Sequence, residues 1–549
     1  MPGWEVLPLE IHQMTLQLVV RDHDPKLHPR ALSGYASVCQ LWRFFFEQHT
    51  FMRLLIRPSC LPSFGQIVCN DQQRLSHLQE LWFLVDLANY GCKSCKRPEN
   101  KVTMESNEAA FTKALWDLLQ ILSLWTRSGW NERHPKLKRK GEDTMMLYLG
   151  AYSRSDSKHV FRDFRLQDGY PFRFPDLSRF PREAYIEYER TVSKLTDHFH
   201  GWKRGRSFPA LGAKKRLFGA RPLGLNFRGV PNPPDNKPLR FPRVDKVTGL
   251  TISRQYYRGI GTDVLGKLFK ESLRRLRWFR HEQWRGVDTG SWNDLVIGTS
   301  KNKPTVEYGP KLTGCSIGYR DMLLNHMPKR LGHLNLFEDF NWLLHKRTSI
   351  SGMPIDASLG RALAESSRGL ETLTASFIVD AIDFFHEFRP GHPRPSTGTR
   401  RPWKKLRYLA LTSPTLDPEL PEGPIQELLI AAGEAAQLMP SLELMEIWNG
   451  GLGYGCFFRY VTIDGVATLT WQCSWDGGSV LVPGLVAVWE RVAGKLPLAV
   501  QVRQFPQQSQ NQDVSLYMDT LRQLLLKGHI LNDIARYQVY YEGARNCIG

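Results

Sequence analysis

Leu406-Arg407-Tyr408-Leu409-Ala410-Leu411 decides the fold, because its pattern of three apolar positions returns along the chain. The last two apolar positions are separated by one residue, as are side chains on one face of a β-strand. Four such triplets begin at Leu331, Leu370, Leu406 and Leu442, roughly every 36 to 39 residues. Less regular copies begin at Leu78, Val247, Leu273 and Val466. The pattern predicts a series of equivalent strands.

Several triplets follow a stretch with the apolar spacing of an amphipathic helix. The stretches that precede a triplet in this way cover residues 264–272, 319–327, 359–366 and 425–439. A helix followed by a strand, repeated at this period, is typical of a leucine-rich-repeat-like solenoid. We therefore predict a mixed α+β or α/β fold, with an irregular leucine-rich-repeat-like body made of helix–strand units.

The residue between the last two apolar positions of a triplet points to the opposite face of the strand. In a solenoid this face is the one that binds a partner. The candidate target-facing residues are Trp82, Thr251, Arg277, Asn335, Thr374 and Glu446. Their chemistry is mixed and they do not form a row of Lys and Arg, so this face fits a protein better than a phosphate backbone.

The N-terminus predicts short amphipathic helices. Pro8 suits a helix start, and Ile11, Met14 and Leu18 then recur on one helical face. A second helical series carries Val38 and Trp42. So few residues bury little surface by themselves, so we expect the apolar faces of these helices to need a partner.

Residues 4–56 resemble an F-box through Leu7-Pro8-Leu9-Glu10-Ile11 and Val38-Cys39-Gln40-Leu41-Trp42. The resemblance implies docking onto a Skp-type adaptor and, through it, onto a cullin ubiquitin ligase. It also implies which residues form the adaptor-binding face, namely Leu7, Pro8, Ile11, Val38, Cys39 and Trp42. Arg154–His159 is similar to an element of large fungal F-box proteins. The alternative for the N-terminus is a plain helical hairpin packed on the body.

Composition divides the chain into four regions. Residues 1–58 form the F-box-like helical domain, and residues 59–167 form a first repeat-like unit with a helix and a strand. Residues 168–243 are rich in Pro, Gly and Arg and read as an insertion or linker that contains one helix. Residues 244–549 form the substrate-binding body. A chain of 549 residues is too long for one ordinary core.

The chain carries a formal net charge of +19, and the positive charge is gathered in two stretches. The first spans residues 131–141, and the second spans residues 198–234, which contain no Asp or Glu. Solvated loops, nuclear import and a nucleic-acid patch are the three interpretations left open. Nine cysteines and no evident secretory leader predict reduced thiols in the cytoplasm or nucleus, and no apolar run is long enough for a membrane helix.

The motifs for catalysis and metal binding are incomplete. Gly261–Lys267 has the spacing of a phosphate-binding loop, but Leu268 replaces the hydroxyl that binds magnesium. Cys92-Lys93-Ser94-Cys95 lacks a second pair and is predicted to be a turn. His198-Phe199-His200 could donate two nitrogens, but the sequence suggests no Cys or carboxylate partner. We predict no metal, no cofactor and no enzyme activity.

The sequence thus predicts the substrate-recognition subunit of a Skp-cullin-F-box ubiquitin ligase. The N-terminal helices would hold the adaptor, and the body would hold an unidentified target protein. Two alternatives remain, namely a basic nucleic-acid-associated protein and an F-box scaffold that acts without a ligase.

Overall fold

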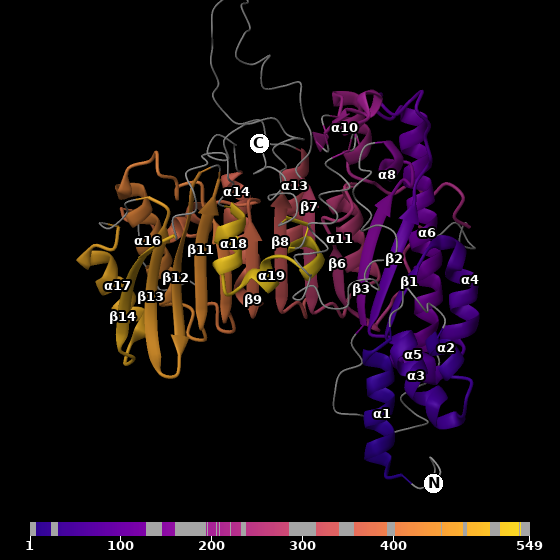
Figure 1. Ribbon diagram of the computed structural model, residues 1–549. Coiled ribbons are helices and arrows are strands. Elements are labelled where there is room, and N and C mark those ends of the chain that lie inside the picture. The colour runs from indigo at the N-terminus through magenta and orange to yellow at the C-terminus, as the bar shows by residue number, and fades with distance from the viewer. Residues whose placement is uncertain are drawn as a thin grey trace, which may run out of the picture.

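The computed structural model describes residues 7–23, 31–127, 145–159, 194, 196–204, 206–207, 209–219, 221–231, 238–284, 314–339, 356–391, 401–451, 453–475, 480–505, 517–536 and 538–539. The described part is a mixed α/β structure built on one large sheet of 12 strands (Figure 1). The mixed fold class expected from the repeated helix and strand patterns is confirmed. The basic stretch 131–141 and the first part of the predicted linker, residues 168–193, lie outside the described residues.

The strands occupy the sheet in the order in which they occur in the chain. Neighbours pair in parallel from β1 to β11. Strand β12 is antiparallel to both of its neighbours, β11 and β13, and β14 again pairs in parallel with β13. The strands are β1 (Arg53–Ile56), β2 (Glu80–Asp86), β3 (Met145–Tyr152), β6 (Val247–Ile252), β7 (Trp278–Trp284), β8 (His333–Asp339), β9 (Thr372–Ser376), β10 (Tyr408–Thr412), β11 (Leu444–Gly450), β12 (Gly455–Ile463), β13 (Val466–Cys473) and β14 (Leu498–Gln504). A separate two-stranded sheet joins β4 (Trp202–Lys203) to β5 (Arg206–Ser207).

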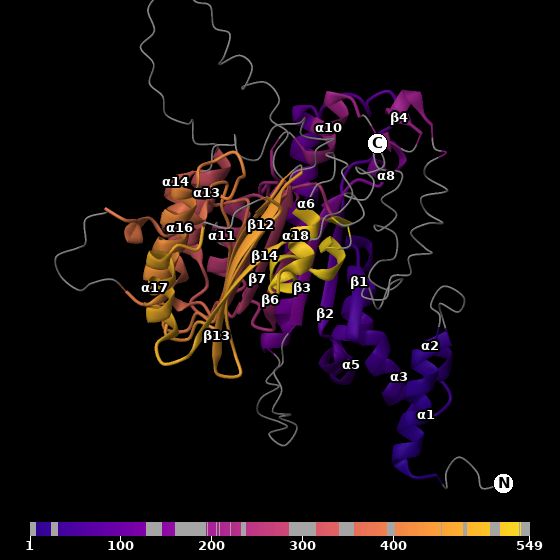
Figure 2. The same cartoon turned by 60° about the vertical axis from the view of Figure 1, so that its left-hand side comes forward.

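One face of the sheet is covered by helices that connect its strands (Figures 1 and 2). These helices are α6 (Lys101–Arg127), α11 (Thr262–Glu271), α13 (Gly314–Asp321), α14 (Ala357–Ser366), α15 (Ala381–Phe384), α16 (Glu422–Ala436) and α17 (Pro483–Ala493). The predicted helices over 264–272, 319–327, 359–366 and 425–439 correspond to α11, the end of α13 with the turn after it, α14 and α16.

The apolar triplets form the core between the sheet and these helices. Leu409 and Leu411 of β10 are fully buried and belong to the same cluster as Leu428 and Leu429 of α16. Because side chains of a strand alternate, every second residue of each strand enters this layer. Burying a leucine contributes roughly 1.5–3 kcal/mol, so the repeated triplets provide much of the driving force for the layer.

The other face of the sheet carries the last part of the chain that the structure describes. Helices α18 (Tyr517–Gln523) and α19 (Lys527–Ile530) lie across it, as both views show (Figures 1 and 2). We call residues 517–539 the C-terminal segment. Its apolar side chains form a second core with residues from the sheet, including Ala410 and Trp448.

The N-terminal helices project from the end of the sheet where β1 lies (Figures 1 and 2). They are α1 (Leu9–Arg21), α2 (Ala31–Tyr35) and α3 (Gln40–Met52), and they are followed by α4 (Leu61–Phe64) and α5 (Gln72–His77). Two further short helices, α8 (Asp156–His159) and α10 (Leu211–Phe218), lie near the opposite tip of the first strands. None of the described helices combines the length and apolar character that crossing a bilayer requires.

Candidate functional site

The N-terminal helices carry exposed apolar side chains on their outer surface. We call this group the N-terminal apolar face, and it consists of Leu7, Leu9, Ile11, Met14, Leu18, Val38, Leu41 and Phe44. Ile11, Met14 and Leu18 share one face of α1, as their spacing predicted. Large apolar side chains left exposed on neighbouring short helices favour a site that binds another protein.

The structure places the predicted adaptor-binding residues in or beside this face. Leu7, Pro8, Ile11, Val38 and Cys39 are exposed, and Trp42 is half-buried. Pro8 immediately precedes α1 with φ −54°, so its predicted role in starting the helix is confirmed. The centroid of the Trp42 ring lies 5.6 Å from that of the buried Phe46 ring, so Trp42 packs against the buried side of α3.

Helix α3 is attached to the body by its buried side. Phe46 is fully buried, and the buried Glu47 carboxylate accepts hydrogen bonds from Arg43 (3.1 Å) and from Arg74 of α5 (2.7 Å). Burial alone would raise the pKa of Glu47, but hydrogen bonds from Arg74 and Arg43 lower it overall. These contacts fix the orientation in which α3 presents Leu41 and Phe44.

The predicted target-facing residues form part of one row across the sheet. The strand register aligns Trp82 with Tyr148, Tyr148 with Thr251, and Asn335 with Thr374, and Glu446 follows through Ala410. The residues of this row are Trp82, Tyr148, Thr251, Arg280, Asn335, Thr374, Ala410, Glu446, Arg459 and Thr470. The alternation rule therefore identified one face of the sheet from sequence.

Arg277 does not belong to this row. Arg280 pairs with Thr251 on one side and with Asn335 on the other, and Arg277 lies before β7 begins. The pattern starting at Leu273 is therefore three residues out of register. The true triplet is Leu276, Phe279 and His281, and the histidine in its last position hides it from a search for apolar residues.

The C-terminal segment covers the row. Trp82, Thr251, Asn335, Thr374 and Glu446 are all buried, and Trp82 packs against Ile534. Thr374 Oγ1 donates to the His529 carbonyl (3.3 Å), and Arg280 donates to the Gly528 carbonyl (2.8 Å). Residues predicted to face a target protein therefore contact the chain's own C-terminal segment.

Two buried glutamates of the sheet hold the backbone of this segment. The Glu446 carboxylate accepts hydrogen bonds from the amides of Leu525 and Leu526, both at 3.0 Å, and pairs with Arg459 at 2.7 Å. The Glu282 carboxylate accepts hydrogen bonds from the backbone N–H of Asn532 (2.7 Å) and from the side-chain Nδ2 of Asn532 (2.6 Å). Burial raises the pKa of Glu282. The two carboxylates thus satisfy backbone donors that a buried segment would otherwise leave without partners.

Several cations of the basic stretch 198–234 are engaged within the fold. Arg216 is buried and donates to the carbonyls of Arg97 (2.7 Å) and Pro98 (3.1 Å). Arg221 pairs with Glu108 through two hydrogen bonds of 3.0 Å. Arg216 is thereby withdrawn from solvent, whereas the Arg221 side chain is paired with Glu108 but stays 60% exposed.

The motifs Cys92–Cys95 and His198–His200, each incomplete as a metal site in the sequence, lie beside His159 in the structure. Cys92 follows β2, His159 ends α8, and His200 ends the short helix at His198–His200. Cys92 Sγ lies 3.7 Å from His159 Nδ1 and 3.7 Å from His200 Nε2, and the two nitrogens are 3.1 Å apart. Sequence reasoning missed this cluster because nothing near His159 or in the spacing marks it as a partner for either motif.

The other motif examined for chemistry has a structural role. Thr262 begins α11, and Lys267, in the place of a phosphate-binding lysine, pairs with Glu271 one helical turn on (2.8 Å). The prediction that this stretch starts a helix is confirmed.

Comparison with known proteins matches part of the body. Residues 326–532 are similar to a family of unknown function (DUF6546). No curated protein and no solved structure matches the chain significantly. The matched region contains both Glu446 and the amides of Leu525 and Leu526 that bind it, so the similarity extends over strands β8 to β14 and most of the segment that covers the sheet.

Proposed function

We propose that this protein is the substrate-recognition subunit of a Skp-cullin-F-box ubiquitin ligase. The observation that carries the proposal is the N-terminal apolar face, at residues that also resemble an F-box. An adaptor would bury these side chains, and each would contribute on the order of 1 kcal/mol or more to binding. The face is on helices that project from the sheet, where a partner can reach it (Figure 1).

The body would be a leucine-rich-repeat-like solenoid that holds the target protein. Strands placed in chain order and connecting helices on one face support this finer description. The receptor needs no catalytic residue of its own, because holding the target near a ubiquitin-charged enzyme raises the effective concentration of the target's lysines.

The C-terminal segment bears on where a target would bind. Glu446 and Thr374 of the predicted target-facing row are occupied by backbone groups of Leu526 and His529. Binding of a target to this row therefore requires the segment to leave it. A target that binds with the segment in place must use another surface of the body.

Adaptor binding is tested with single aspartate substitutions in the full-length protein. Val38→Asp and Met14→Asp change side chains that are 61% and 59% exposed, so neither is expected to disturb the fold. Each would place a charge in the buried interface and is expected to weaken adaptor binding at least about tenfold, or roughly 1.4 kcal/mol. Ile463→Asp is the matched control, since Ile463 is 58% exposed at the end of β12.

The measurement is the affinity of a purified Skp-type adaptor for each variant, with circular dichroism to verify folding. Equal affinity for the wild type, Val38→Asp and Met14→Asp would refute the proposed interface. If the adaptor binds but no cullin assembles on the complex, the ligase-independent scaffold is the correct alternative. If no adaptor binds and nucleic acid binds with a steep salt dependence, the basic stretches carry the function instead.

A further inference from the structure

We propose that Cys92, His159 and His200 bind a zinc ion, with Cys95 as the fourth ligand. This site lies apart from the N-terminal apolar face and from the row under the C-terminal segment. The three side chains come from three separate elements and bring their ligand atoms within 4.8 Å of one another. Thiolate and imidazole are the ligand types that zinc prefers.

The distances within the cluster are those of a tetrahedral zinc site. Zinc bonds of about 2.3 Å to sulfur and about 2.05 Å to nitrogen, at the tetrahedral angle, require separations of about 3.6 Å between S and N and about 3.3 Å between two N atoms. The observed separations are 3.7 Å for each S–N pair and 3.1 Å for the N–N pair. All three agree with the requirement to about 0.2 Å.

The hydrogen bonds of the two histidines indicate which nitrogens carry hydrogen. His200 Nδ1 lies 2.8 Å from the Asp197 carboxylate, and His159 Nε2 lies 3.2 Å from the Tyr90 carbonyl. A carboxylate and a carbonyl accept hydrogen bonds, so both of these nitrogens are assigned as donors. In neutral imidazoles the other two nitrogens then present lone pairs to each other at 3.1 Å. A cation bound by both nitrogens would use both lone pairs.

The surrounding contacts give the site its outer support. The Asp197–His200 pair is the carboxylate–histidine arrangement that orients metal ligands in many proteins. The Tyr90 amide donates to Ser155 Oγ (2.9 Å), and Ser153 Oγ donates to the Ala88 carbonyl (2.9 Å). These bonds join the loop that carries Cys92 to the one that leads to His159, so the ligands are held in place by the fold.

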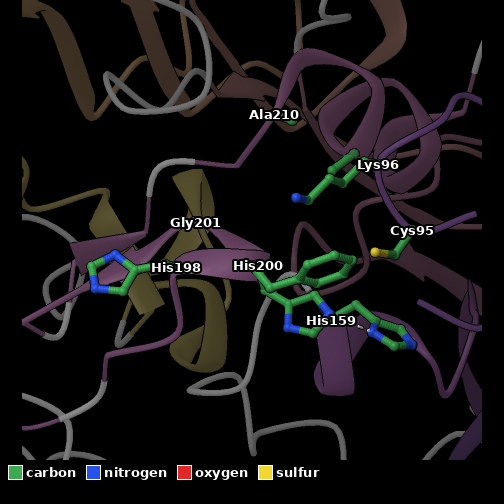
Figure 3. A pocket seen from close by; sticks show the side chains of 9 residues that line it. Cys95, Lys96, His159, His198, His200, Gly201 and Ala210 are labelled. Atoms are coloured by element: carbon green, nitrogen blue, oxygen red, sulfur yellow. Dashed lines mark hydrogen bonds between the residues drawn. The ribbon is translucent and has the colours of Figure 1, made fainter. Parts of the chain in front are cut away.

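Cys95 is the candidate for the fourth position, and its thiol must turn to reach it, because its Sγ is not among the ligand atoms that lie within 4.8 Å of one another. It is buried, stands three residues after Cys92 in the same turn, and lines one pocket together with His159 and His200. Figure 3 shows its sulfur on the same side of the pocket as these histidines, while His198 points away from them. The Cys95 thiol now donates a weak hydrogen bond to the Cys92 carbonyl (3.2 Å), which metal binding would replace.

Four protein ligands make a closed site, which is the structural class of zinc centre. Such an ion would join the loops after β2 and β3 to the segment at His198–His200. We therefore expect zinc to stabilise this end of the sheet and to have no catalytic role.

The experiment measures metal in the full-length protein purified with zinc present. Elemental analysis is expected to find about one zinc per chain in the wild type and in His198→Gln, and almost none in His200→Gln. His198 is the internal control because it belongs to the same His-Phe-His motif but faces away from the cluster. Cys60→Ser is the matched control for Cys92→Ser, since both cysteines are exposed.

Cobalt substitution in the wild type identifies the ligands even where a variant fails to fold. A tetrahedral site with two thiolates is expected to give intense visible bands together with sulfur-to-cobalt charge-transfer absorption. Wild-type protein without stoichiometric zinc, and without these bands when cobalt is added, would overturn the proposal. Unchanged zinc affinity in Cys95→Ser would overturn the assignment of Cys95 as the fourth ligand.

Discussion

Glu446→Gln is the substitution that tests how the C-terminal segment is held on the sheet. The Glu446 side chain is fully buried, and its two oxygens accept from Arg459 and from the amides of Leu525 and Leu526. Glutamine has nearly the same shape but one acceptor oxygen and no charge. Its amide group must therefore face either the Arg459 guanidinium or a backbone N–H, and neither can accept a hydrogen bond.

The expected cost follows from these contacts. Leaving one buried donor unsatisfied costs about 1–3 kcal/mol. Arg459 also loses the partner of a guanidinium that is only 12% exposed, and breaking a buried ion pair costs about 3–5 kcal/mol in all. We expect the free energy of unfolding to fall by an amount in this range, mainly because the C-terminal segment opens more easily.

The assay combines urea unfolding with hydrogen exchange of the full-length protein. Exchange at the Leu525 and Leu526 amides should accelerate more than exchange in the core of β10. Glu443→Gln is the control, because Glu443 lies just before β11 and makes a partly exposed pair with Arg407, which solvent screens. A change below about 1 kcal/mol in Glu446→Gln, with unaltered exchange, would refute the reasoning.

Two further predictions concern other buried groups. Burial lowers the pKa of His281 to about 3, whereas an unfolded histidine takes up its proton near 6.5. The unfolded state therefore binds more protons between these values, and stability falls as the pH drops from about 6.5 towards 3, by at most about 1.4 kcal/mol per pH unit from this residue. His281→Phe should flatten this part of a stability–pH curve measured by urea unfolding; an unchanged slope would contradict it. Asp197→Asn removes the charge that orients His200 and should weaken zinc binding about 10-fold to 100-fold in a competition titration, whereas equal affinity would exclude this supporting role.

The sequence alone predicted those features that depend on residues close together in the chain. Leu409 and Leu411 identify β10 and its buried face, and Ile11, Met14 and Leu18 identify the outer face of α1. In both cases the information lies within a few residues, because strand and helix periodicities are local properties.

The remaining features depend on residues that are distant in the chain. Glu446 binds Leu526 across 80 positions, and Cys92 meets His200 across 108. No periodicity connects such partners, so the covering of the sheet and the Cys–His cluster could not be predicted. The register error at Arg277 has another cause. Leu273 and Leu276 have the spacing of the first two positions of a triplet, although Leu276 is in fact the first position of the triplet that Phe279 and His281 complete.

The path of the C-terminal segment has a consequence for how the chain reaches its final state. Because the strands follow chain order, the sheet can grow strand by strand as the polypeptide leaves the ribosome. The segment then runs back over it, from Glu446 of β11 through Glu282 of β7 to Trp82 of β2. Until the C-terminal segment is synthesised, the nascent protein exposes Trp448, Ala410 and their neighbours, which makes this face the one that a chaperone would need to protect.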